Sequence, residues 1–322
     1  MKLKQTFASV EYTSLNYKYK RISGETMGRW FLIGAVLLWF SLLILFPLWG
    51  IIEETVKKGL TIFISNLSSP SSLHAFWLTL VITLFAVILN TILGTILAVV
   101  FARQSFKGKL FMESLIDMPF AVSPVVAGLM FIILFGPNGW IGRWFNAMNI
   151  KIIYALPGMM IATLFVTLPF VAREILPVLR EFGREQEEAA ATLGASQWQI
   201  FWRVTLPSIK WGLAYGITLT IARSIGEFGA VLVVSGSIIN KTQTATLRIH
   251  DQFTDFNYTG AFSAALVLAI LSFIILNFIQ YLYKKKRAAP ATQDAAQSAE
   301  KIRNSKKVCF FARFCRILIK RR

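Results

Sequence analysis

Six long apolar runs limit what this chain can fold into. They cover about residues 30–50, 75–101, 110–135, 157–179, 209–235 and 260–283. A bilayer core of about 30 Å is crossed by roughly 20 mostly apolar helical residues, and each run is about that long or longer. In lipid only helices and closed barrels satisfy the backbone, and these runs are too long for barrel strands. The sequence therefore predicts an all-α membrane protein with six transmembrane helices.

The composition agrees with a bilayer-embedded chain, and its positive charge is concentrated at the two ends. Hydrophobic residues make up 55% of the 322 residues, far more than in an ordinary soluble domain. Of the 34 Lys and Arg residues, 6 lie in residues 1–29 and 13 in residues 284–322. No nucleic-acid motif accompanies them, so the net charge of +18 does not predict nucleic-acid binding. We expect a leader (1–29), a membrane domain (30–283) and a basic tail (284–322) whose composition predicts disorder.

Basic residues beside the apolar runs predict the orientation, because Lys and Arg are retained on the cytoplasmic side. With the N-terminus in the cytoplasm, the outer loops carry only Lys57, Lys58, Arg143, Lys151, Lys241 and Arg248. The inner segments then carry clearly more, including the cluster Lys284 to Arg287. Both termini are therefore expected in the cytoplasm of a bacterial cell, and so is the loop between the fourth and fifth runs.

Helix-breaking residues interrupt three of the runs. They are Pro119 and Pro124 in the third, Pro169 and Pro177 in the fourth, and Gly216, Gly226 and Gly229 in the fifth. Proline removes a helical hydrogen bond, and small residues let helices approach closely. Kinks or close helix contacts are expected at these places.

A polar stretch, EEAAATLGASQWQIFWRVTLP (187–207), separates the fourth and fifth runs. Its spaced features are Glu188, Ala189, Ala190, Gly194, Leu206 and Pro207. This spacing resembles the EAA loop of ABC importer permeases, and 184–207 is called the EAA loop below. Helix-forming residues predict a short amphipathic helix here, with a bend at Gly194 and the next helix beginning at Pro207.

The resemblance implies a type I ABC importer permease fold in which the EAA loop is a cytoplasmic coupling helix. It would dock in a cleft on a separate ATPase, with Glu188 as the polar anchor. Gly108-Lys109 is followed by Leu110 and lacks the upstream glycine of a phosphate-binding loop, so ATP hydrolysis on this chain is not predicted. No catalytic constellation, cofactor site or metal-ligand cluster is expected, and Cys309 and Cys315 in the tail predict neither a disulfide framework nor a metal site.

Three further sequence blocks extend the resemblance and indicate which substrate the permease carries. They are DMPFAVSPVVAGLMF (117–131), FVTLPFVAREILPVL (165–179) and ARSIGEFGAVLVVSGSI (222–238). Together they resemble sulfate/thiosulfate permeases of the CysW type, over about residues 28–283. That family implies a heterodimer with a second related permease, an ABC ATPase dimer, and a periplasmic or lipid-anchored sulfate-binding protein. GEFGA alone is shared with molybdate permeases, so a molybdate or tungstate permease is the alternative within this class.

Charged residues inside the runs are the remaining candidates, because they are costly in hydrocarbon unless they pair or face water. Arg223 and Glu227 are four apart on one predicted helical face and could pair, and Arg173 could pair with Asp117 across helices. The same residues could instead line a path for an anion. A different class, an ion-coupled secondary anion carrier, would also use such charges, but it has no need of an EAA loop.

Overall fold

The computed structural model describes residues 23–57 and 59–281, and the regular elements in those ranges are all helices. The chain divides into two units, Met1–Glu53 and Glu54–Arg322. The expectations for residues 1–22 and for the tail 284–322, with Cys309 and Cys315, lie outside the described residues.

Most of one long membrane-type helix lies in the first unit, and this helix starts earlier than the sequence predicted. Helix α1 (Ser23–Phe40) passes through a π-helical turn, η1 (Ser41–Leu45), into α2 (Phe46–Lys57). The span Gly28–Thr55 is apolar, and most of its side chains are exposed, as expected for a helix that faces lipid. Phe46, the residue before Pro47, donates its backbone N–H to the carbonyl of Ser41. The π-turn thus adjusts the backbone where proline cannot continue the normal ladder.

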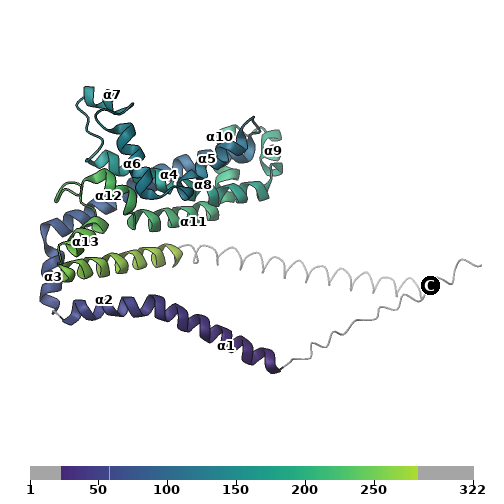
Figure 1. The fold of residues 1–322 in the computed structure, drawn as a ribbon. Coiled ribbons are helices and arrows are strands. Elements are labelled where there is room, and N and C mark those ends of the chain that lie inside the picture. The colour runs from purple at the N-terminus through teal and green to yellow at the C-terminus, as the bar shows by residue number, and fades with distance from the viewer. Residues whose placement is uncertain (1–22, 58, 282–322) are drawn as a thin grey trace, which may run out of the picture. The chain divides into compact units, whose positions relative to one another are not determined.

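The second unit holds the remaining helices (Figure 1). They are α3 (Leu60–Ser68), α4 (Pro70–Arg103), α5 (Lys109–Ala121), α6 (Pro124–Phe135), α7 (Gly142–Ala147), α8 (Leu156–Phe182), α9 (Glu185–Thr192), α10 (Gln197–Ile200), the π-helical η2 (Phe201–Thr205), α11 (Leu206–Ile225), α12 (Gly229–Ser235), α13 (Ala245–Thr254) and the helix Tyr258–Tyr281.

Four helices in the described residues are long and apolar enough to cross a membrane, or up to six if each of two bent pairs counts as one span. The third predicted run is not one straight helix: α5 and α6 meet at an angle of 110°. Pro124 disfavours a helical conformation at Ser123, which is extended. The fifth run is bent by 52° between Ile225 and Gly229. By contrast, α8 continues as one helix through Pro169 and Pro177.

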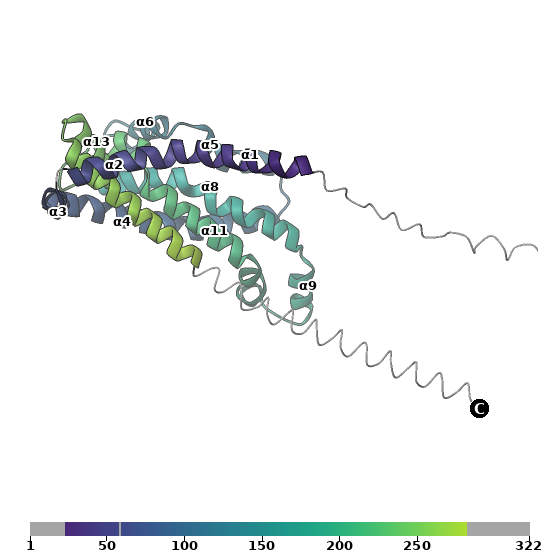
Figure 2. The ribbon, with the colours of Figure 1, turned by 90° about the horizontal axis from the view of Figure 1, so that it is seen from below.

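Helices α4, α8 and α11 run side by side and form the centre of the second unit (Figure 2). Glycines allow the close approach. A Cβ on Gly94 of α4 would lie 2.7 Å from the Val171 Cβ of α8, and one on Gly216 of α11 would lie 2.9 Å from the Val171 Cα. Ala98, Ile175 and Ile209 extend this core and are almost fully buried. In lipid, apolar burial between helices adds little, so helices associate through close packing at small residues.

A polar contact also joins α4 to α8. The buried Asn90 amide donates from Nδ2 to the Thr167 hydroxyl at 2.6 Å and to the Leu164 carbonyl at 3.2 Å. An interhelical hydrogen bond of this kind fixes which faces of two apolar helices meet.

Candidate functional site

The EAA loop is built from a short helix, a bend, and the start of a long helix. Helix α9 ends at Thr192, and Gly194 has φ +86°, a left-handed conformation that favours glycine. Ser196 then begins α10 with a capping box, in which its hydroxyl accepts from Gln199 N–H and the Gln199 side chain accepts from Ser196 N–H. The bend predicted at Gly194 is therefore present.

The start of the following helix differs from the sequence expectation. The helix begins at Gln197 and continues to Ile225, rather than beginning at Pro207. The π-turn η2 precedes Pro207, and Leu206 N–H donates to the Phe201 carbonyl. As at Pro47, a π-turn lets the helix run through a proline that lacks a donor. The second half of the EAA loop is thus continuous with the spanning helix.

Glu187 connects the EAA loop to the ends of several helices. Its Oε1 accepts from Arg103 Nη2 at 2.9 Å and from the Thr205 hydroxyl at 2.8 Å. Its Oε2 lies 2.9 Å from Arg103 Nε, and both side chains are at least 80% buried. Arg103 Nη1 also donates to the Leu179 carbonyl at 3.3 Å. Helix α9 is therefore tied to the last turn of α4, the last turns of α8 and the helix that becomes α11.

Glu188, the predicted anchor, points elsewhere. Its side chain is exposed on α9 and lines an open groove of about 390 Å³ together with Gln104 and Arg184. Ala189 is exposed as well, Ala190 is half-buried, and Leu193 beside the Gly194 bend is 88% exposed. Leu206 is half-buried and Pro207 exposed at the beginning of α11. This outer face of the loop is available to another molecule.

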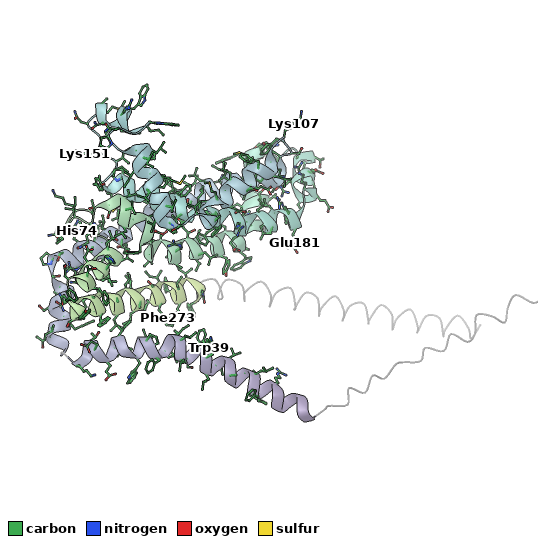
Figure 3. All side chains as sticks on the ribbon, viewed as in Figure 1. Trp39, His74, Lys107, Lys151, Glu181 and Phe273 are labelled. Carbon is green, nitrogen blue, oxygen red and sulfur yellow. The ribbon has the colours of Figure 1, made fainter. Side chains whose placement is uncertain are left out.

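The EAA loop lies at one end of the second unit. Lys107 and Glu181 lie at that same end, whereas His74 and Lys151 lie at the opposite end (Figure 3). The helix Tyr258–Tyr281 starts beside α13 and runs toward the end with α9 and α10 (Figures 1 and 2).

The structure brings Asp117 of α5 and Arg173 of α8 together. Arg173 Nε donates to Oδ1 at 2.8 Å and Nη2 to Oδ2 at 3.0 Å, a bidentate pair. The guanidinium carbon lies 4.7 Å from the centre of the Phe120 ring. A second ion pair on the same two helices joins Arg180 to Glu113 at 2.7 Å.

Arg223 and Glu227 also meet, but not on a continuous helical face. Helix α11 ends at Ile225, so Glu227 lies in the break before α12. Its Oε2 is 2.6 Å from Arg223 Nη1, and its Oε1 accepts from Ala230 N–H at 2.9 Å. The Thr246 hydroxyl donates to the Glu227 carbonyl at 2.8 Å. This buried carboxylate satisfies a free backbone donor in the first turn of α12 and supports the bend.

Comparison with known proteins identifies the family. The family described as binding-protein-dependent transport system inner membrane component matches residues 90–288, which include the EAA loop and the three ion pairs just described. The chain belongs to this family. As an inner membrane component, it has several apolar helices that could cross the bilayer.

Named relatives and solved structures agree with the family. The chain is 51% identical to the sulfate transport system permease protein CysW of Synechocystis sp. over 248 residues, covering 77% of this chain and 90% of the relative. Two Escherichia coli proteins are also similar: CysW is 47% identical (77% of this chain, 86% of the relative) and CysT is 36% identical (79% and 91%). A bacterial alginate ABC transporter chain matches with a TM-score of 0.71 at 16% identity, covering 83% of this chain and 98% of that one. That structural likeness shows the type I ABC importer permease fold.

Sequence reasoning missed Arg103 and Thr205 as partners of the EAA loop. No spacing pattern in the sequence links Arg103 to a carboxylate 84 positions away. Phe120, beneath the Arg173 guanidinium, was missed for the same reason.

Proposed function

We propose that this chain is a permease subunit of an ATP-driven importer for sulfate, and that its EAA loop couples it to a separate ATPase. The choice of sulfate as the transported substrate rests on the 51% identity to a CysW sulfate permease protein over most of both chains. The observation that supports coupling is the Glu187 ion pair, which ties the loop to the ends of the spanning helices.

The outer face of the EAA loop supplies the contact with the ATPase. Leu193 and Glu188 are exposed on one short segment, and Gly194 provides the bend that presents them. A cleft on the ATPase that closes on ATP binding would move α9 as a unit. Through Glu187, Arg103 and Thr205 that movement would reach α4, α8 and α11 together.

The assembly contains a second, related permease. Escherichia coli has both CysW and CysT, and this chain is more similar to CysW than to CysT. We infer a heterodimer of the two types in the lipid bilayer, an ATPase dimer on the cytoplasmic face, and a periplasmic or lipid-anchored sulfate-binding protein outside. Thiosulfate, a dianion of similar shape, is included in the proposed cargo.

Both termini of the chain are placed in the cytoplasm. The basic residues support this orientation, and the last long helix runs toward the end that carries the EAA loop. The native Cys309 and Cys315 allow a direct test. A membrane-impermeant maleimide should label them only after cells are permeabilised, whereas a cysteine introduced at the exposed Ile239 should react in intact cells. Labelling of the native cysteines in intact cells would contradict this orientation and place the C-terminus outside.

Uptake measurements test the cargo. In a host without other sulfate importers, deletion of this gene should abolish uptake of radioactive sulfate, and the plasmid-borne gene should restore it. Undiminished ATP-dependent uptake in the deletion strain contradicts the proposal. Excess molybdate should compete poorly, whereas strong competition would favour a molybdate permease. Uptake that persists without ATP but collapses with a proton ionophore would favour a secondary carrier.

A further inference from the structure

Arg173 is a charged residue deep in a spanning helix that remains open on one side. It lies nine positions before Phe182 at the end of α8, and therefore about 14 Å from that end at 1.5 Å per residue. Even so, 56% of its side chain is exposed, and its partner Asp117 is 38% exposed. Charged groups at such depth face protein or water rather than lipid. The open side of Arg173 therefore faces a second protein or an aqueous path.

The contacts of Arg173 occupy only part of its guanidinium. The group carries five N–H donors in a planar fork. Asp117 takes one edge through Nε and Nη2, and Phe120 covers one face of the plane. The edge that includes Nη1 is left for another acceptor. Phe170 packs edge-on against Phe120 at 5.0 Å between ring centres, which holds the supporting ring in place.

The other intramembrane pair lacks these properties. The Glu227 side chain is 1% exposed, and its oxygens are taken by Arg223 and by the backbone of Ala230. That pair supports the bend between α11 and α12. Arg180, which pairs with Glu113 on the same two helices as Arg173, lies only two residues from the end of α8. It is the natural comparison for a role in helix pairing alone.

We propose that Arg173 is a transient contact for the transported tetrahedral oxyanion, which binds the free edge of the guanidinium while Asp117 holds the opposite edge. This inference rests on the proposed function. The fork suits two anion oxygens at once, as in bidentate phosphate and carboxylate recognition. Asp117 has two effects: it fixes the orientation of Arg173, and its negative charge weakens the hold on a dianion. A weak contact is what a path requires, because the anion must leave again.

The test uses the complete importer, with its partner permease, ATPase and binding protein, reconstituted in vesicles that contain ATP. Sulfate uptake and ATP hydrolysis are measured together, so that sulfate moved per ATP is the readout. Arg173→Lys keeps a cation beside Asp117 but cannot serve both edges, and Arg173→Gln removes the charge. Arg180→Lys and Arg180→Gln are the matched controls.

We expect Arg173→Lys to assemble and hydrolyse ATP normally while moving about tenfold less sulfate per ATP, the loss typical of one charge-assisted hydrogen bond. Arg173→Gln should move still less, and the Arg180 variants should stay within about twofold of the wild type. An unchanged ratio in both Arg173 variants overturns the inference. So does an equal loss in the Arg180 variants, or failure of Arg173→Lys to co-purify with the partner permease. If the wild type moves no sulfate, the proposed function itself fails.

Discussion

Arg103 and Glu187 are 84 positions apart in the chain, yet Arg103 Nη2 donates a hydrogen bond to Glu187 Oε1 at 2.9 Å. Arg103 ends α4, and Glu187 lies in the first turn of α9. Because Thr205 donates to the same carboxylate and Arg103 also reaches the Leu179 carbonyl, one ion pair joins the EAA loop to three spanning helices.

Removing the charge of Glu187 should loosen the EAA loop. Glu187→Gln keeps the shape but loses a charge-assisted, mostly buried contact, which typically stabilises by about 1–3 kcal/mol. We expect faster amide hydrogen exchange in α9 and a lower unfolding temperature. Glu188→Gln on the same helix is the control: its side chain is exposed, so the exchange rate and unfolding temperature should stay nearly unchanged. Equal effects of the two substitutions would contradict the role given to Glu187.

A charge at the tip of the EAA loop should leave folding unaffected but should weaken binding of the ATPase. Leu193 is 88% exposed, so Leu193→Asp leaves the core intact. A desolvated aspartate in an apolar contact is unfavourable, and we expect at least tenfold weaker ATPase binding in pull-down experiments. Leu193→Met, which keeps an apolar side chain of similar volume, should bind normally. Unchanged ATPase binding by Leu193→Asp would remove Leu193 from the proposed contact.

Loss of the Asn90 amide should weaken the α4–α8 contact. Interhelical hydrogen bonds in membranes contribute about 0.6 kcal/mol on average and up to about 2 kcal/mol. Asn90→Ala should lower the free energy of unfolding in mixed micelles by about that amount. Thr91→Ala is the matched control, because the Thr91 hydroxyl donates only to the Val87 carbonyl of its own helix. A larger loss in Thr91→Ala would argue against the interhelical explanation.

A methyl group at Gly94 should separate α4 from α8. Its Cβ would lie 2.7 Å from the Val171 Cβ, and overpacking of this kind costs about 1–3 kcal/mol. Gly34→Ala is the control, since no atom lies within 4 Å of an added Cβ there. Val171→Ala in the Gly94→Ala background removes the Val171 Cγ1, which would lie 2.9 Å from the added Cβ, and should recover part of the lost stability. If the second substitution only adds to the first, contact with that Cγ1 methyl group is not a cause of the loss.

The helices were predictable from the sequence because their signal is local. The fourth run, predicted at 157–179, corresponds to α8 at Leu156–Phe182, and the second, predicted at 75–101, to α4 at Pro70–Arg103. Run length and hydropathy alone define such helices. For the bend in the third run, only its position was predictable from the sequence. Pro124 permits it, but the angle of 110° depends on how α6 packs on α12, where a Cβ on Gly128 would lie 2.9 Å from the Ala230 carbonyl.

By itself, the sequence determined that the chain is helical and suited to a membrane, where the EAA loop lies, and which family the chain resembles. These properties depend on residues close together in the chain. Only the tertiary structure decided that Glu187 is tied to Arg103, that Glu227 lies in a break rather than on a helix, and that Arg173 keeps a free edge beside Asp117. Each depends on which helix faces meet, and that is set by the close packing of α4, α8 and α11 around small residues rather than by any local pattern.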